Sequence, residues 1–371
     1  MSTVKTPPLA TAQRLPAEQL HAAELQRLVA ADSGPRPQGW RLSPAMVRTF
    51  ILGSGGREIE GAVVVRKIFG NDEVVERAIV TLVGQRGLML VGEPGTAKSL
   101  LSELLAAGIC GDSTLTVQGS AGVVEESIRY GWNYALLLRS GPGPEALVPG
   151  PLHRAMSRGA LLRFEEISRC PTEVQDNLIP ILSERLLHVP EMKEGADACL
   201  LARPGFNVIA TANLKDRGVN DMSSALKRRF NFETMRPLAR LQDQKELLLR
   251  EVNMQLQAQG IAIRLPVDVA HLLATAFQEL RAGSVEGLAI ESPSTVLSSA
   301  EAIAVAFSAA VQCHYFGEPE VRPQHLSQFM LGTVIKDDER DGQRFRDYLR
   351  VIRQVRAGSP EWQDFAALRS D

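Results

Sequence analysis

The sequence lacks any hydrophobic run long enough to cross a membrane. Its longest apolar stretch, residues 302–311, is interrupted by Ser308, whereas a membrane-spanning helix needs about 20 apolar residues. Residues 1–20 also lack the continuous apolar segment of a secretory signal. These absences predict a cytoplasmic protein without a membrane span.

The sequence also lacks a strong charge bias and a cysteine pattern. It has 41 Lys and Arg against 43 Asp and Glu, a formal net charge of −2, and no cluster of five basic residues. The composition therefore disfavours nucleic acid as a partner, because such binding is driven by excess positive charge. With no C-x-x-C pair and no His at ligand spacing, we interpret the four cysteines as buried thiols. They are Cys110, Cys170, Cys199 and Cys313.

The 371 residues, 44% of them hydrophobic, are enough for two or three domains. Residues 1–62 form an N-terminal extension with expected helices at 17–31 and from the Ser43-Pro44 cap to Leu52. Between 63 and 236, short apolar strands alternate with helices, which is typical of a parallel sheet covered on both faces. The strands are expected at 88–91, 114–117, 160–164, 207–210 and 230–234. After Pro237 strands stop, and helices are expected at 242–258, 267–282, 293–315 and 323–335. The fold class is therefore α/β with an all-α region at 237–371.

One expected strand runs directly into a glycine-rich loop and a helix, in the sequence LMLVGEPGTAKS at 88–99. In a P-loop, backbone N–H groups wrap a phosphate, the Lys reaches the β- and γ-phosphates, and the Ser hydroxyl binds Mg²⁺. The pattern has Gly before the Lys, where this chain has Ala97. The alternative is an ordinary strand-turn-helix corner with a solvated Lys98. The predicted phosphate-binding residues are Gly92, Glu93, Pro94, Gly95, Thr96, Ala97, Lys98 and Ser99.

A second expected strand ends in two adjacent carboxylates, Glu165 and Glu166. Hydrolysis needs a carboxylate at Mg²⁺ and a group that orients or deprotonates water. Glu165 is predicted to bind the metal with Ser99, and Glu166 to act on the water. Such patterns usually begin with Asp, so Glu165 is one methylene longer than expected, and the buried Arg163 needs a polar partner. Two alternatives are a pair that only caps the next helix and a site that binds ATP without hydrolysis.

Two later stretches supply further polar groups. The strand at 207–210 leads to Asn213, whose amide would hold the attacking water beside the γ-phosphate. The alternative for Asn213 is an Asx turn. Arg228 and Arg229 lie at a helix-to-strand junction, and the planar guanidinium suits the charge that spreads over a transferred phosphoryl group. The alternative for the arginines is a solvated pair.

The order GEPGTAKS, FEEISRCP, ATANLKDRG and SSALKRRF resembles the AAA+ ATPases, and among them the MoxR-like branch, over about residues 66–335. The segments at 148–152, 170–175 and 181–185 strengthen this likeness, and the loop form G-x-P-G-x-A-K-S, with Ala97, resembles that of MoxR-like proteins. The resemblance implies a P-loop αβα sandwich, the AAA+ core at 63–236, with a five-stranded parallel sheet and then an all-α lid. It also implies ATP with Mg²⁺ and a homo-oligomeric ring, usually a hexamer.

The resemblance also implies roles for individual residues. Lys98, Glu166 and Asn213 would be catalytic, and Ser99 with Glu165 would bind the metal. Arg229, with Arg228 as the second choice, would be the arginine finger that serves the ATP of a neighbouring copy. The insert at about 120–150 and the hairpin at about 187–202 would face substrate in the pore of the ring.

The expected lid departs from the MoxR-like pattern at Ser294. An arginine that reaches the γ-phosphate is expected there, in an S-P-R context, whereas this chain reads Ser-Pro-Ser. Arg264 or Arg281 would be the replacements. The leading hypothesis is an ATP-driven factor that remodels or assembles a protein partner, by resemblance one with a von Willebrand A domain. The alternatives are a chelatase-type motor for metal insertion, an ATP-gated scaffold with negligible turnover and, last, a nucleic-acid motor.

Overall fold

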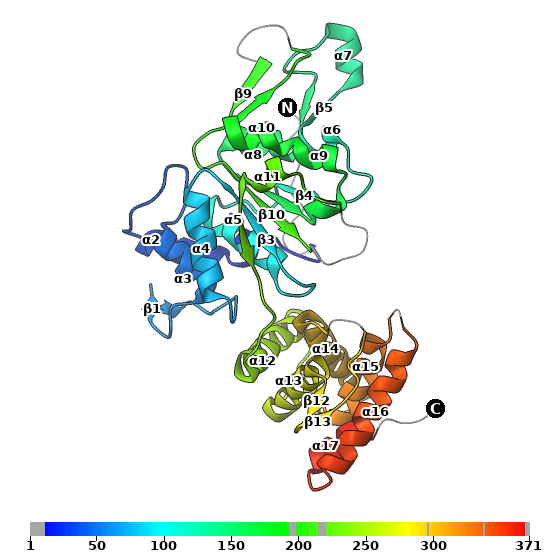
Figure 1. The fold of residues 1–371 in the computed structure, drawn as a ribbon. Helices are drawn as coiled ribbons and strands as arrows, with labels where there is room; N and C mark the ends of the chain where they lie inside the picture. Colours follow the sequence, from blue (N-terminus) through cyan, green and yellow to red (C-terminus); the bar gives the residue numbers. More distant parts are fainter. Residues whose placement is uncertain (1–11, 193–197, 214–219, 295–296, 337, 368–371) are drawn as a thin grey trace. The chain divides into compact units, whose positions relative to one another are not determined.

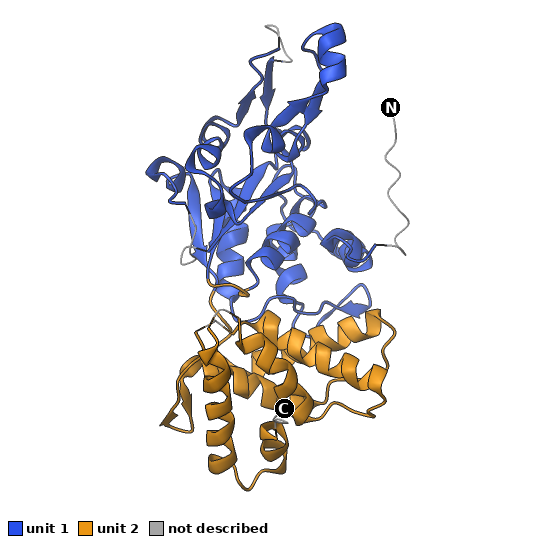
Figure 2. Ribbon diagram, turned by 90° about the vertical axis from the view of Figure 1, so that its right-hand side faces the viewer, with its two compact units in different colours: residues 1–92, 97–235 blue, residues 93–96, 236–371 orange. Residues whose placement is uncertain are grey.

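A computed structural model describes residues 12–192, 198–213, 220–294, 297–336 and 338–367 (Figure 1). Contacts divide the chain into two compact units (Figure 2). Unit 1 comprises residues 1–92 and 97–235, and unit 2 comprises residues 93–96 and 236–371.

Unit 1 is built on a five-stranded parallel sheet with the strand order β11-β3-β10-β7-β4. All residues of β3, β7 and β10 are buried, as expected for central parallel strands with near-continuous apolar sequence. The five strands predicted from the sequence are all present, with ends shifted by at most two residues. Their bounds are β3 Gly87–Val91, β4 Thr116–Gln118, β7 Leu161–Glu165, β10 Asn207–Ala212 and β11 Phe230–Thr234.

Helices cover both faces of this sheet, and alternate strand residues point to each. Leu88 and Leu90 of β3 belong to one buried cluster, together with α3 Pro44–Leu52, α4 Asp72–Val83 and α5 Lys98–Ile109. Met89 and Val91 belong to the opposite cluster, together with α8 Pro151–Arg158 and α10 Leu178–Glu184. This alternation is the period-2 pattern of a strand that is buried on both sides.

The N-terminal segment packs into the first of these clusters. The helical stretch expected at 17–31 consists of two helices, α1 (Ala17–Leu20) and α2 (Ala22–Ala31), which are separated by His21. Leu25 and Leu28 of α2 are fully buried in the cluster that also holds α5. The expected cap of α3 is confirmed, since the Ser43 side chain accepts a hydrogen bond from the Met46 N–H at 3.3 Å.

Shorter elements fill the rest of unit 1. They are β1 Glu58–Ile59, β2 Ala62–Val63, α6 Glu125–Ile128, β5 Tyr130–Trp132, α7 Tyr134–Ser140, β6 Leu147–Pro149, a 3-10 turn Ile167–Arg169, α9 Thr172–Asp176, β8 Leu186–His188, β9 Cys199–Leu201 and α11 Ser224–Lys227.

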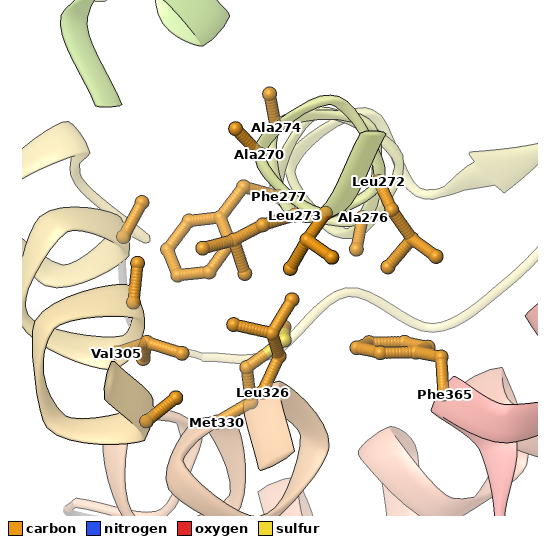
Figure 3. Close-up of a cluster of buried hydrophobic side chains, with 14 of the residues drawn as sticks. Ala270, Leu272, Leu273, Ala274, Ala276, Phe277, Val305, Leu326, Met330 and Phe365 are labelled. Carbon is orange, nitrogen blue, oxygen red and sulfur yellow. The ribbon is translucent and has the colours of Figure 1, made fainter. Parts of the chain in front are cut away.

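Unit 2 is predominantly helical around its own core. Phe277 and Leu273 of α13 pack with Val305, Leu326 and Phe365 in this cluster (Figure 3). The helices are α12 Leu241–Ala258, α13 Val267–Ala282, α14 Ser299–Phe316, α15 Pro323–Val334, α16 Arg340–Val355 and α17 Pro360–Ala366.

Two expectations for this region are wrong. The helix expected from Pro293 begins at Ser299 instead, because Ser298 and Glu301 form a capping box that fixes its start. Strands do not stop after Pro237 either, since β12 (Ser284–Val285) and β13 (Leu288–Ala289) form a short antiparallel hairpin.

Candidate active site

The loop between β3 and α5 has the backbone conformation of a phosphate cradle. Gly92 and Gly95 have φ of 154° and 72°, angles that glycine adopts at low cost. Ala97 is also left-handed, at φ 66° and ψ 25°, and is the N-cap of α5 without a side-chain cap. The loop is braced by Thr96 Oγ1, which donates to the Glu93 carbonyl at 2.8 Å. Such alternation of conformations directs successive N–H groups into one concavity.

The Lys98 ammonium lies against this loop. Its Nζ donates to the carbonyl of Gly92 at 2.8 Å, at the point where β3 ends. The helix that begins at Lys98 presents its N-terminus to the same loop, which favours an anion there. The structure therefore places the Lys98 ammonium at Gly92, the first predicted phosphate-binding residue.

Glu165, the last residue of β7, is 5% exposed and bonded through both carboxylate oxygens. Its Oε2 accepts from the Ser99 hydroxyl at 2.7 Å and from the Thr211 hydroxyl at 2.8 Å. Its Oε1 accepts from Ser102 Oγ and, at 2.9 Å, from Arg163 Nη2. Ser99 and Glu165, predicted from separate motifs to share a metal, are thus in direct contact. The expected partner of Arg163 is Glu165 itself.

Glu166 follows in a strained conformation, with φ 52° and ψ 44°. Its N–H donates to Thr211 Oγ1 at 2.9 Å, and its carboxylate forms an ion pair with Arg169. The Glu166 side chain is 46% exposed, so it remains accessible to solvent next to the buried Glu165. Left-handed non-glycine residues cluster at functional sites because the surroundings must hold them there.

Gly119, which directly follows the neighbouring strand β4, supports this strained turn. Its N–H donates to the Glu165 carbonyl at 2.7 Å. A Cβ at this position would lie 2.2 Å from the Glu166 carbonyl oxygen, so only glycine fits without moving the backbone. Gly119, Thr211 and Ser102 are not among the predicted site residues, although each lies within a few residues of a predicted strand end or of the P-loop.

Asn213 comes directly after β10, which lies between β3 and β7 in the sheet. Ala212 of β10 is level with Val91, and Ala210 is level with Phe164. Asn213 therefore lies at the same carboxyl edge as Gly92 and the two glutamates, where parallel sheets bind ligands.

The two predicted finger arginines lie at the opposite edge of the sheet. Phe230 is level with Gly87, and the Gly87 N–H donates to the Arg229 carbonyl at 2.9 Å. Arg229 is held by Ser183 Oγ and by the Ala225 carbonyl, both at 2.9 Å, and Arg228 is exposed. The full length of β3, about 16 Å at ~3.3 Å per residue, separates them from Gly92. They are therefore not assembled with the other site residues within one copy.

The segments expected to face substrate lie next to each other in unit 1. In the insert, α7 has no buried residue, and Tyr134 and Leu138 are 73% and 89% exposed. The Tyr130 hydroxyl of β5 donates to Glu191 at 2.9 Å, which links the insert to the β8–β9 hairpin (Figure 1). Burial and this hydrogen bond raise the pKa of Tyr130 to about 12. Residues 193–197 of the predicted hairpin lie outside the described residues.

In unit 2, Ser294 is tied to α16 in place of the expected arginine. Its N–H and hydroxyl both donate to Asp341, at 2.9 Å for the N–H, and Arg344 donates to the same carboxylate at 2.7 Å. Burial alone would raise the pKa of Asp341, but these hydrogen bonds lower it. Of the two replacement arginines, Arg264 is exposed, while Arg281 donates to Gln244 Oε1 at 2.9 Å.

Comparison with known proteins gives two matches that together span most of the chain. Residues 87–230 match the AAA domain of the dynein-related subfamily, and residues 242–371 match the YehL-like AAA+ ATPase C-terminal domain. The uncharacterized protein YehL of Escherichia coli (strain K12) is 47% identical over 336 residues, which cover 91% of each chain. The chain belongs to the YehL-like AAA+ ATPases.

The chain also has more distant similarities. Chaperone MoxR1 of Mycobacterium tuberculosis is 28% identical over 186 residues, which cover 50% of this chain and 45% of MoxR1. A crystal structure of NtrX from Brucella abortus in complex with ADP has a TM-score of 0.47 and 14% identity, and covers 80% of this chain and 65% of NtrX. The resemblance to MoxR-like AAA+ ATPases is confirmed by the family matches and by YehL.

Two kinds of feature are absent from the described residues of this YehL-like ATPase. No helix in the described ranges is long and apolar enough to cross a membrane. The same part of the chain holds no group of three or more His, Cys, Asp or Glu side chains arranged as a metal site. The hard oxygen donors of Ser99 and Glu165 do suit Mg²⁺, which proteins usually hold through one or two carboxylates together with substrate phosphates.

Proposed function

We propose that this YehL-like ATPase hydrolyses Mg²⁺-ATP in a homo-oligomeric ring, a hexamer, to remodel or assemble a protein partner in the cytoplasm. The AAA+ core would be residues 63–236 and the lid 237–371, with residues 1–62 as an N-terminal extension. The observation that carries the chemistry is the convergence at one sheet edge of the loop at Gly92, the Ser99–Glu165 contact and Asn213. That edge holds phosphate-binding, metal-binding and water-orienting groups together, as phosphoryl transfer requires.

Each residue has a role that its position supports. Backbone groups of residues 92–97 and Lys98 bind the phosphates. Ser99 and Glu165 supply hard oxygen ligands to Mg²⁺, which stabilises charge on the phosphates when bound. The exposed carboxylate of Glu166 polarises the attacking water, and the Asn213 amide orients it.

The distant edge that holds Arg228 and Arg229 supports a site shared between copies. An arginine stabilises phosphoryl transfer only when it reaches the transferred group, and β3 keeps both of these away from the loop of their own chain. In a ring, Arg229, or Arg228 as the second choice, would reach the nucleotide of the next copy. This is the physical reason for preferring a ring to a monomer.

Phosphate release from the wild type, Lys98→Ala and Glu166→Gln tests the chemistry. We expect the rate of phosphate release to fall at least tenfold in both variants, because each removes a group that acts in the transition state. Lys227→Ala and Glu173→Gln are matched controls on exposed side chains and should retain wild-type turnover. Equal hydrolysis by wild type, Lys98→Ala and Glu166→Gln would overturn the site assignment. ATP-dependent assembly without phosphate release from the wild type would favour the scaffold alternative.

Mixing experiments test the shared site. Arg229→Ala and Glu166→Gln copies are each expected to be inactive alone and to recover activity when mixed, because some mixed interfaces then combine an intact Glu166 with an intact Arg229. Arg228→Ala in the same mixtures decides which arginine acts. No recovery at any ratio would count against the ring.

The partner is proposed from the similarity to MoxR-like proteins, as a protein with a von Willebrand A domain. Glu166→Gln held in ATP should retain it, and mass spectrometry of the captured complex identifies it. The parallel test for the chelatase alternative is ATPase stimulation by a tetrapyrrole-binding partner. Stimulation of turnover by DNA, lost at high salt, would instead point to a nucleic-acid motor.

A further inference from the structure

Arg163 is a buried charge in the middle of β7, only 8% exposed, and every nitrogen of its guanidinium donates a hydrogen bond. Nε donates to Ser102 Oγ at 3.0 Å, and Nη1 donates to the Ser113 carbonyl at 2.8 Å and to Thr116 Oγ1 at 3.5 Å. Nη2 donates to the Ser99 carbonyl at 3.2 Å and to Glu165 Oε1 at 2.9 Å. A guanidinium has five N–H donors, so this side chain is fully satisfied and fixed in one orientation.

Residues 163 and 165 lie on the same face of β7 because side chains alternate along a strand. The two oxygens of Glu165 consequently have different surroundings. Oε1 is bound by Arg163 and Ser102, on the side toward the middle of the strand. Oε2 is bound by the hydroxyls of Ser99 and Thr211, on the side toward the P-loop. Oε1 is held by a guanidinium and a hydroxyl, whereas Oε2 contacts Ser99, the other predicted metal ligand.

We propose that Arg163 and Ser102 are positioning residues that hold Glu165 at the reach an aspartate would have, so that only Oε2 is presented beside Ser99. We call this pair the Arg163–Ser102 clamp. Glu is longer than the usual Asp by one C–C bond, ~1.5 Å, and an unanchored carboxylate of that length would occupy several rotamers. The clamp rests on the proposed function, in which Glu165 and Ser99 bind Mg²⁺.

The clamp also sets the charge of the site. Arg163 and Glu165 form an ion pair with no net charge, so attraction of a divalent cation depends on the nucleotide phosphates. Metal should therefore bind tightly only together with nucleotide, which agrees with the preference of Mg²⁺ for sites completed by substrate phosphates.

Ser102→Ala is the decisive variant because it removes one hydroxyl that joins Arg163 Nε to Glu165 Oε1. Mn²⁺ serves as the probe, with free Mn²⁺ measured by electron paramagnetic resonance in the presence of ADP and full-length protein. We expect the dissociation constant of Mn²⁺ to rise about tenfold, the effect of losing one hydrogen bond to a charged group. Thr116→Val is the matched control, because Thr116 contacts the same guanidinium but not the carboxylate, and it should change Mn²⁺ binding less than twofold.

A second variant separates positioning from general support of the fold. Glu165→Asp should weaken Mn²⁺ binding by itself. The shorter carboxylate cannot reach the Arg163–Ser102 clamp and the hydroxyls of Ser99 and Thr211 at the same time. Ser102→Ala should then add nothing in the Glu165→Asp background, a non-additivity that independent sites do not show. Thermal unfolding of each variant records any structural effect separately.

Several outcomes overturn the clamp: unchanged Mn²⁺ binding in Ser102→Ala, equal weakening by Ser102→Ala and Thr116→Val, or the same effect of Ser102→Ala in both backgrounds. If the wild type hydrolyses ATP while any of these holds, the clamp alone fails. If the wild type neither releases phosphate nor binds Mn²⁺ with ADP, the proposed function fails and the clamp fails with it.

Discussion

Ala97 stands in a left-handed conformation where the P-loop pattern has glycine, and its replacement by glycine has a calculable effect. At φ 66° and ψ 25° the Cβ of an L-residue costs ~1–2 kcal/mol, which Ala97→Gly removes. Glycine also gains freedom in the unfolded chain, which costs ~0.4–1 kcal/mol of stability. The difference predicts that Ala97→Gly raises the free energy of unfolding by about 1 kcal/mol.

Calorimetry of the full-length protein measures this change. For a unit of this size, 1 kcal/mol corresponds to a rise in midpoint of about 2–4 °C. Ala23→Gly is the matched control: Ala23 is exposed within the helix α2, where glycine costs ~0.5–1 kcal/mol. The same chemical change is thus expected to have opposite signs at the two sites. A lower midpoint for Ala97→Gly, or the same sign for both variants, would refute the assignment of strain to Ala97.

Two other sites give predictions of different kinds. Gly119→Ala should lower the rate of phosphate release more than tenfold, because its Cβ would lie 2.2 Å from the Glu166 carbonyl oxygen. Gly122→Ala is the control and should leave the rate unchanged, because a Cβ there meets nothing within 4 Å. Equal activity of the two variants would contradict the steric constraint at Gly119. His325 is buried, and its Nδ1 accepts the Arg322 N–H at 3.0 Å; burial, with a contribution from Arg322, lowers its pKa below the ordinary 6.5. Because the unfolded chain then binds the proton more readily, stability should fall as pH drops from about 6.5 through the folded-state pKa. Urea midpoints from pH 7.5 to 5 should show this loss, and His325→Gln should reduce it; an unchanged slope would exclude His325 as its source.

The sheet of unit 1 was predictable because each of its strands has a local sequence pattern that indicates a strand. The central strands are short and mostly apolar, with Arg163 as the exception in β7, and each is followed by a turn or by polar residues, which is typical of strands buried on both faces. The P-loop and the carboxyl end of β7 follow these runs directly. Their convergence could therefore be inferred from the rule that parallel strands place their carboxyl ends at one edge.

Features that depend on distant contacts were not predictable in the same way. The need of Arg163 for a partner was visible in the sequence, but the contributions of Ser102 and Ser113 depend on how α5 and β4 pack beside β7. At the break between α1 and α2, the His21 ring packs edge-on against Phe50 of α3, with centroids 5.6 Å apart. Helical periodicity across 17–31 contains no sign of that contact.

Arg229 and the P-loop lie at opposite edges of the sheet, and the order of motifs along the sequence could not predict this. Motif order along the chain places the arginines after Asn213, and nothing in that order says at which end of the sheet they fall. The register of β11 against β3 decides it, since Phe230 is level with Gly87. Only with this register does a physical argument for a second copy arise.

Ala97 departs from the P-loop pattern and Glu165 from the acidic pattern at the end of β7, and the two departures differ in their physical character. Ala97 is left-handed, and its methyl group cannot cap the helix, so glycine there is expected to be favourable. Glu165 is accommodated by four donors, three hydroxyls and a guanidinium, so a return to aspartate is expected to be unfavourable unless those donors change too. A consensus residue is therefore not equally acceptable at both positions. A consensus residue is expected to be acceptable only where the neighbouring side chains do not depend on the residue that it replaces. At Glu165 they do depend on it, because Arg163 donates a hydrogen bond to its carboxylate.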